Sequence, residues 1–346
     1  MPAWGVIGHE PAVRLLAREA RQAAPAHAHL LLGPAHVGRG TLARAFAAAL
    51  VCDAVAGERP CGACRHCRRV LEGDTPQHPD VHLLSLEGPC ADDARHGGWH
   101  AGDQRWIGVC QVRYWTAHLD RTPFEARRRV LLVDPADRLT PDAQNAFLKT
   151  VEEPPAGVVI VLVAQSEGAL LPTLRSRCRA LQLGRVRERL IAAWLEGRGV
   201  EPDLARQAAA LADGRPGAAL ALAGSPARLD EWERAREDAL QRAFEPLDRA
   251  LAWSAETAEL WARERERAEE RLDAQVQAWR VALRAAADGG ATAPAGMPAG
   301  LGPVGAAAAV RAWLQVRKDL DHNTNARLTL DVAVLRARRA VERGYT

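Results

Sequence analysis

The stretch His29–Leu50, HLLLGPAHVGRGTLARAFAAAL, decides the fold class of this chain. Its opening HLLL is almost entirely apolar and predicts a short buried strand, which Gly33 and Pro34 end. Residues 42–50 predict the helix that follows. A strand, a glycine loop and a helix N-terminus, in this order, point backbone N–H groups at phosphate oxygens. The stretch therefore predicts a phosphate-binding loop within an α/β domain.

This loop lacks two side chains that nucleotide chemistry uses. In the pattern G-x-x-x-x-G-K-[ST], the Lys reaches the β- and γ-phosphates and the hydroxyl holds magnesium. Gly33 and Gly38 have the required spacing, but Arg39 replaces the Lys and Gly40 replaces the hydroxyl residue. Thr41 comes one position too late. We therefore expect binding of ATP without turnover at most.

The composition is that of an ordinary globular protein. The 346 residues suit two or three domains, and the net charge of only +3 excludes a strong overall field for nucleic acid or membranes. The first residues, MPAWGVIGHEP, lack the charged and apolar regions of a signal peptide. No apolar run approaches the ~20 residues that span a bilayer. We expect a cytoplasmic protein with reduced thiols and no membrane partner.

Four cysteines have the spacing of metal ligands. Cys52, Cys61, Cys64 and Cys67 lie in CDAVAGERPCGACRHC, where two overlapping C-x-x-C steps follow a cysteine upstream. Four thiolates make the closed tetrahedral shell of a structural zinc site, so we expect Zn²⁺ here. An iron–sulfur cluster and a thioredoxin-like redox pair are the alternatives. We expect His66, within this motif, to be solvated, and a substitute metal ligand is the alternative role.

The other cysteines lack such spacing, and we expect three isolated thiols: Cys90, Cys110 and Cys178. The segment 88–106 is polar and glycine-rich, and it also contains His96 and His100. A second metal site there would have few and irregularly spaced ligands. A surface loop is therefore the expected structure of this segment.

Two further apolar runs extend the predicted sheet. Arg129–Asp134 ends in a carboxylate and resembles the strand whose terminal Asp holds magnesium in phosphate-loop ATPases. The alternative role of Asp134 is to cap a helix at the strand end. Val158–Ala164 predicts another buried parallel strand. Strands that alternate with helices over residues 1–185 predict an α/β fold with a parallel sheet flanked by helices on both faces.

Four stretches of the chain resemble the bacterial DNA polymerase III clamp-loader family, a branch of the AAA+ proteins. These stretches are WGVIGHE at 4–10, TPDAQNAFLKTVEEPP at 140–155, LPTLRSRC at 171–178 and NTNARLTL at 323–330. The resemblance covers nearly the whole chain. It implies an AAA+ domain at 1–185 with an inserted zinc module at about 51–70, a helical lid at 186–226 and a helical collar at 230–346.

The resemblance also gives meaning to the losses. Motor subunits of that family, of the gamma/tau type, keep the loop Lys and Thr, a Glu after the magnesium Asp, and an Arg that contacts the γ-phosphate. Here Pro135 stands in place of the Glu and Gly217 in place of that Arg. Combined losses of this kind resemble the delta-prime branch of the family, and they imply a largely non-hydrolysing scaffold.

One catalytic motif is retained, and the resemblance assigns all three of its residues, Ser176, Arg177 and Cys178, to the catalytic site. In Ser176-Arg177-Cys178 the family's Arg projects into the ATP site of a neighbouring subunit, where a guanidinium stabilises charge on the transferred phosphoryl group. The alternative is a solvated basic loop, because Arg175 and Arg179 flank Arg177.

The resemblance implies partners as well. These are gamma/tau and delta subunits in a hetero-pentamer, and through that ATP-driven complex of DNA polymerase III, the sliding clamp and primed DNA. Two other functions stay open at this point. One is a weakly active ATPase of the gamma/tau type, and the other is a zinc-dependent DNA-binding protein that acts alone.

Overall fold

The computed structural model describes residues 4–54, 58–100, 105–242, 245–288, 294, 296–297, 300–321 and 324–343. The chain forms two compact units, Met1–Ala221 and Leu222–Thr346. The finer division into three domains stays a prediction.

Unit 1 is built on a five-stranded sheet in the order β2-β5-β6-β1-β7. Every neighbouring pair is parallel. The strands are β1 (Ala28–Leu32), β2 (Val81–Leu84), β5 (Arg129–Val133), β6 (Val158–Ala164) and β7 (Arg179–Gln182). The predicted fold class is therefore confirmed, and the three apolar runs that predicted strands form β1, β5 and β6.

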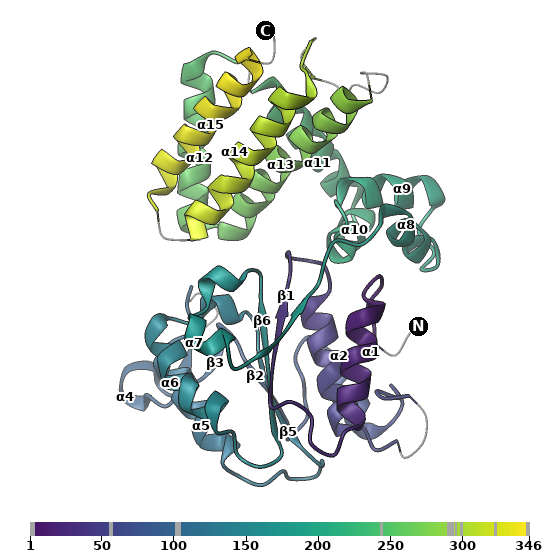
Figure 1. Ribbon diagram of the computed structural model, residues 1–346, viewed down its shortest axis with the longest axis vertical. Coiled ribbons are helices and arrows are strands. Elements are labelled where there is room, and N and C mark those ends of the chain that lie inside the picture. Colours follow the sequence, from purple (N-terminus) through teal and green to yellow (C-terminus); the bar gives the residue numbers. More distant parts are fainter. Residues whose placement is uncertain are drawn as a thin grey trace. The chain divides into compact units, whose positions relative to one another are not determined.

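Helices cover both faces of this sheet. Helices α1 (Glu10–Arg21) and α2 (Arg39–Val51) lie on one face, and α5 (Val109–Leu119), α6 (Pro141–Glu152) and α7 (Pro172–Arg175) lie on the other (Figure 1). Side chains of a strand alternate between these layers. Val161 packs in the core with Phe46 of α2, whereas Ile160 and Leu162 pack in the core with Phe147 of α6. The residues of β6 are accordingly all buried.

Shorter elements complete unit 1. Helix α3 (Arg65–Leu71) follows α2, and a small module comprises β3 (Gly88–Pro89), α4 (Asp93–His96) and β4 (Trp99–His100). Strands β3 and β4 pair antiparallel. After β7 come α8 (Glu188–Glu196), α9 (Pro202–Leu211) and α10 (Pro216–Ala223), the last of which crosses the boundary between the units.

Unit 2 is helical throughout its described part. Its helices are α11 (Pro226–Gln241), α12 (Leu247–Arg263), α13 (Arg265–Ala287), α14 (Pro303–Asp321) and α15 (Ala326–Arg343) (Figure 1). Trp253, Trp279 and Trp313 belong to its core. Asn323 of the NTNARLTL stretch lies outside the described residues, whereas the Asn325 side chain accepts a hydrogen bond from the Leu328 amide at 3.1 Å and caps α15.

Across the described part of both units, no helix combines the length and the apolar character needed to cross a membrane.

Asp80, which precedes β2, has a buried carboxylate that holds the backbone just before β5 in place. Its two oxygens accept the backbone amides of Phe124, Glu125 and Ala126 at 2.6, 2.8 and 2.9 Å. The Arg129 guanidinium lies 3.5 Å from the same group. Burial alone would raise the pKa of Asp80, but the three amide hydrogen bonds outweigh it and lower the pKa below its usual range.

We expect Asp80→Asn to lower the free energy of unfolding of unit 1 by about 2–3 kcal/mol at pH 7, because an amide N–H₂ would face amide donors. Since the folded-state pKa is depressed, this stabilisation is present above the unfolded pKa of about 4 and is lost as pH falls through the folded value. The difference between variant and wild type should therefore shrink at pH 3. Hydrogen exchange of the β5 amides measures the stability of unit 1 separately.

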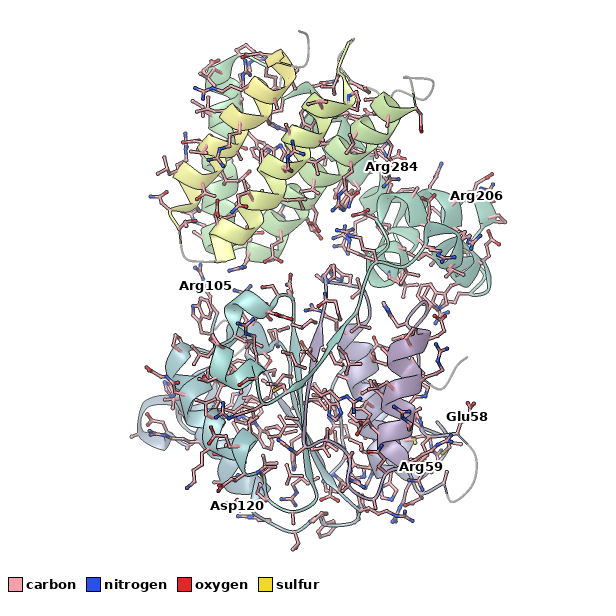
Figure 2. All side chains as sticks on the ribbon, viewed as in Figure 1. Glu58, Arg59, Arg105, Asp120, Arg206 and Arg284 are labelled. Carbon is pink, nitrogen blue, oxygen red and sulfur yellow. The ribbon has the colours of Figure 1, made fainter. Side chains whose placement is uncertain are left out.

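The matched control is Asp120→Asn, at the C-terminal end of α5 (Figure 2). Asp120 is exposed, and we expect a change within about 0.5 kcal/mol. Equal effects of the two substitutions would contradict the role given to Asp80.

Candidate functional site

The glycine loop joins β1 to α2, as the sequence predicts. Gly38 is the residue before α2 and has a left-handed backbone, with φ 102°. This conformation, which favours glycine, lets the chain turn from the loop into the helix. The Nε2 of His9 lies 2.9 Å from the carbonyl oxygen of Val37 and holds the loop from the side of the N-terminal segment.

Asp134 lies directly above the loop, at the end of β5. A Cβ atom added to Gly40 would come within 2.8 Å of the Asp134 Oδ2 atom, so a Ser or Thr at this position would collide with the carboxylate unless it moved. Burial raises the pKa of Asp134 to about 6, although the positive charge of Arg39 lowers it. The carboxyl group is thus still mainly ionised at pH 7. The structure thus places Arg39, Gly40 and Asp134 beside one another.

Gly217, in α10, lies against the glycine loop. Its amide donates a hydrogen bond to the His36 carbonyl at 2.9 Å. A Cβ atom at Gly217 would lie 3.1 Å from that same oxygen, which is tighter than ordinary contact. An Arg at position 217 would therefore press its Cβ atom against the His36 carbonyl.

A cavity of about 400 Å³ remains beside the loop. It is lined by the loop, by Val6 and Ile7 of the N-terminal segment, and by Trp194 and Arg198 of the helical region. The Arg198 guanidinium stacks 3.8 Å from the centre of the Trp194 ring. The cavity thus brings the glycine loop and the Trp194–Arg198 pair to one place.

The three arginines around Ser176-Arg177-Cys178 differ in their surroundings. Arg175 pairs with Glu167 at 3.1 Å, and Arg179 pairs with the nearly buried Glu19. Arg177 pairs with Glu152 at 2.6 Å, and its Nη1 also donates to the Thr173 carbonyl at 2.7 Å. The side chains of Arg177 and Glu152 are 37% and 43% exposed. Arg177 is thus held by one exposed carboxylate, a partner that sequence reasoning missed.

The neighbours of Arg177 contribute local structure. The Ser176 hydroxyl donates to the Thr173 carbonyl at 3.1 Å, and the Cys178 thiol donates to the Leu174 carbonyl at 3.3 Å. Burial raises the pKa of Cys178 to about 12, so this thiol stays protonated at neutral pH. A catalytic role for Ser176 or Cys178 stays a prediction.

Arg177 and the glycine loop lie at opposite edges of the sheet. Arg177 comes two residues before β7, and β7 begins with Arg179 paired to His29 at the start of β1. The loop instead follows the last residue of β1, Leu32. With about 3.3 Å per residue along a strand, roughly 15–20 Å separates these points. Arg177 therefore cannot serve the loop of its own chain.

The four cysteines predicted as ligands come together at the end of α2. The Sγ atoms of Cys52, Cys61, Cys64 and Cys67 all lie within 4.8 Å of one another, with Cys61 and Cys67 at 3.9 Å. A tetrahedral zinc with Zn–S bonds of about 2.3 Å separates its sulfurs by about 3.8 Å. The cluster therefore has the dimensions of a metal site.

Backbone amides support the same sulfurs. The Cys64 amide donates to the Cys61 sulfur at 3.3 Å, and the Cys67 amide donates to the Cys64 sulfur at 3.4 Å. These N–H···S contacts begin α3. The amide of Cys64 lowers the pKa of Cys61 to about 6, whereas burial raises the pKa of Cys67. One ligand is thus ready to ionise, and a metal would drive the ionisation of the buried thiol.

The expectation of a solvated His66 is wrong. His66 is completely buried: its Nδ1 lies 2.6 Å from the Nε2 of His78, and its Nε2 lies 2.9 Å from the Asp53 carboxylate. Burial lowers the pKa of His78, which favours a neutral ring there. No local pattern signals this pair, because its second member lies twelve residues further along the chain.

The expected isolation of Cys90 and Cys110 is also wrong. Their sulfurs and the ring nitrogens of His96 and His100 all lie within 4.8 Å of one another.

A protein-family model and several relatives match this chain. A family model described as "DNA polymerase III, delta subunit" matches residues 8–187. The DNA polymerase III subunit delta' of Pseudomonas aeruginosa is 35% identical over 153 residues, which cover 44% of this chain and 42% of the relative. The subunit delta' of Escherichia coli is 33% identical over 229 residues, 66% of this chain and 60% of that protein. The matches thus span about half the length of these relatives.

Among solved structures, a DNA polymerase III gamma subunit-related protein of Thermotoga maritima aligns with 94% of this chain and 98% of its own. The TM-score is 0.44 and the identity 18%. The fold is established by the order and direction of the strands, independently of this likeness.

The match of residues 8–187 covers just over half of the 346 residues. The resemblance predicted from TPDAQNAFLKTVEEPP and LPTLRSRC is therefore confirmed, and the chain belongs to the DNA polymerase III delta subunit family.

Proposed function

We propose that this chain is a delta-prime-type subunit of a clamp loader, which does not hydrolyse ATP itself and supplies Arg177 to the ATP site of a neighbouring subunit. One observation carries the proposal. Arg177 is exposed at the sheet edge opposite to its own glycine loop, while the loop lacks its catalytic side chains. Groups that would serve the chain's own site are absent, and the group that would serve another site is retained.

The geometry of the loop argues against the alternative of a weak gamma/tau-type ATPase. Pro135, after Asp134, has no carboxylate to activate water. Asp134 lies where the hydroxyl of a Ser or Thr would have to fit above Gly40. Arg39 is bulkier than the Lys it replaces and adapts less well as a compact point charge. Retained binding without turnover fits these features better than slow hydrolysis.

The pairing of Arg177 with Glu152 is compatible with a role in another subunit. An exposed ion pair of this kind contributes about 0–1 kcal/mol. The γ-phosphate of a neighbour's ATP carries more charge than one carboxylate and offers oxygens that suit the bidentate fork of a guanidinium. Arg177 can therefore leave Glu152 and bind a phosphate at little cost to the stability of the free chain.

Within this proposal the chain keeps the expected division, with an AAA+ domain at 1–185, a lid at 186–226 and a collar at 230–346. The partners are gamma/tau and delta subunits, with the sliding clamp and primed DNA engaged through the complex in the cytoplasm. We also assign Zn²⁺ to Cys52, Cys61, Cys64 and Cys67. Four thiolates leave no open coordination position, so the metal would be structural and would fix α3 onto the end of α2.

We expect Arg177→Ala to slow ATP hydrolysis at the neighbouring site by at least about 100-fold, because a trans arginine stabilises charge in the transition state. The DNA-stimulated rate of ATP hydrolysis by the reconstituted complex should fall by the fraction of the total rate that this one site contributes. Size-exclusion chromatography should show unchanged assembly, since Arg177 makes only exposed contacts.

Arg175→Ala is the matched control, since Arg175 lies two residues away and pairs with Glu167. It should leave hydrolysis by the complex near the wild-type rate. An Arg177→Ala complex with unchanged hydrolysis would rule out the arginine finger.

For the cysteine cluster, we expect Cys64→Ser to lower the zinc content by one ion per purified chain and to lower the melting temperature. The serine hydroxyl is a poor zinc ligand, and the metal site contributes directly to the stability of its module. Cys178→Ser, which alters a thiol outside the cluster, should leave the zinc content unchanged. Elemental analysis of both variants checks this. If the wild-type protein contains iron instead of zinc, the cluster is the iron–sulfur alternative.

A further inference from the structure

A second group of metal-ligating side chains lies in the segment between β2 and α5. Cys90 directly follows β3, His96 ends α4, His100 ends β4, and Cys110 lies in the first turn of α5. The two sulfurs and two ring nitrogens approach one another within 4.8 Å. These four residues, hereafter the CHHC cluster, share no member with the four-cysteine cluster.

The distances within the CHHC cluster suit a tetrahedral ion. The Cys90 Sγ atom lies 3.6 Å from the His96 Nδ1 atom. Zinc bonds of about 2.3 Å to sulfur and about 2.0–2.1 Å to nitrogen place such atoms about 3.5 Å apart. The His100 Nε2 atom lies 3.0 Å from the Cys110 Sγ atom, so that pair would have to open by about 0.5 Å. The His96 and His100 rings also lie together, with centres 4.1 Å apart.

The ligands come from elements that are held in place. The Cys90 amide donates to the Gly98 carbonyl at 2.9 Å, and the Ala91 amide donates to the Cys110 carbonyl at 3.1 Å. Cys90 and His100 are only 3% and 4% exposed. The cluster is therefore a convergent and partly buried site, unlike a chance meeting of surface side chains.

The module around the CHHC cluster has little else to stabilise it. Its strands have two residues each and its helix has four. Trp99, its largest apolar side chain, is 54% exposed. Segments too small to build an apolar core are commonly held by metal ions or disulfides. A cross-link at this place would join β3, α4 and β4 to α5.

We propose that Cys90, His96, His100 and Cys110 form a second structural zinc site. Two thiolates and two imidazoles are a ligand set that zinc prefers, and four protein ligands leave no position for a substrate. The first cluster would hold α3 on the sheet face covered by α2. The second would hold the β3–β4 module on α5, which covers the opposite face.

The test is the zinc content of the full-length chain. The protein is purified under reducing conditions, stripped of metal and titrated with Zn²⁺ alone. We expect two ions per wild-type chain, and one ion per chain in either Cys64→Ser or Cys90→Ser. The double variant should bind none tightly. Circular dichroism shows whether each variant has folded.

Substitutions of His96 separate ligation from a structural effect. His96→Ala should weaken binding of the second ion at least tenfold, whereas His96→Cys supplies another ligand and should retain it. His118→Gln, in the same helix as Cys110 but outside the cluster, should still bind two ions. Co²⁺ in the Cys64→Ser variant should give the visible absorption of a site with two sulfurs and two nitrogens.

Two results would overturn the proposal. One is a wild-type chain that binds a single ion, lost in Cys64→Ser and kept in Cys90→Ser. The other is a Cys90–Cys110 disulfide that persists in the reduced preparation and leaves no second zinc. The proposed role of Arg177 stands or falls independently of either result.

Discussion

A parallel sheet that is buried on both faces leaves room for polar chemistry only at the ends of its strands, and the arrangement of unit 1 depends on this constraint. The residues of β1, β5 and β6 are buried along their whole lengths. The glycine loop and Asp134 therefore meet beyond the carboxyl ends of β1 and β5. Arg177, before β7, comes to the opposite edge. The same sheet thus separates the glycine loop from Arg177 and, within our proposal, lets the two face different subunits.

At the glycine loop, neighbouring groups occupy the space beside the glycines that stand in place of catalytic residues. The His36 carbonyl accepts the Gly217 amide, and the Asp134 carboxylate lies above Gly40. A side chain placed at Gly40 or Gly217 would bring its Cβ atom against these groups. The loop leads into α2 through Gly38 and is bonded to α10 through the His36 carbonyl, so its backbone also has a structural role.

Much of this could be predicted from sequence where the signal is local. The apolar runs of β1, β5 and β6 and the spacing of the four cysteines each lie within a short window. Strand β7, RALQ, has mostly exposed residues, and its strand character comes from pairing with β1. Likewise, Cys90 and Cys110 are twenty residues apart and meet only because the chain at the end of β3 packs against the start of α5. His66 is buried against His78, and no local sequence pattern links these two residues.

The most direct test of the account is the hydrolysis of ATP by the purified full-length chain with Mg²⁺ and no partner subunit, followed over a single turnover. The account predicts no hydrolysis above the uncatalysed background, even if nucleotide binds beside Trp194. Turnover at the rate of a motor subunit, abolished by Asp134→Asn, would show that the loop is a working active site and would contradict the account.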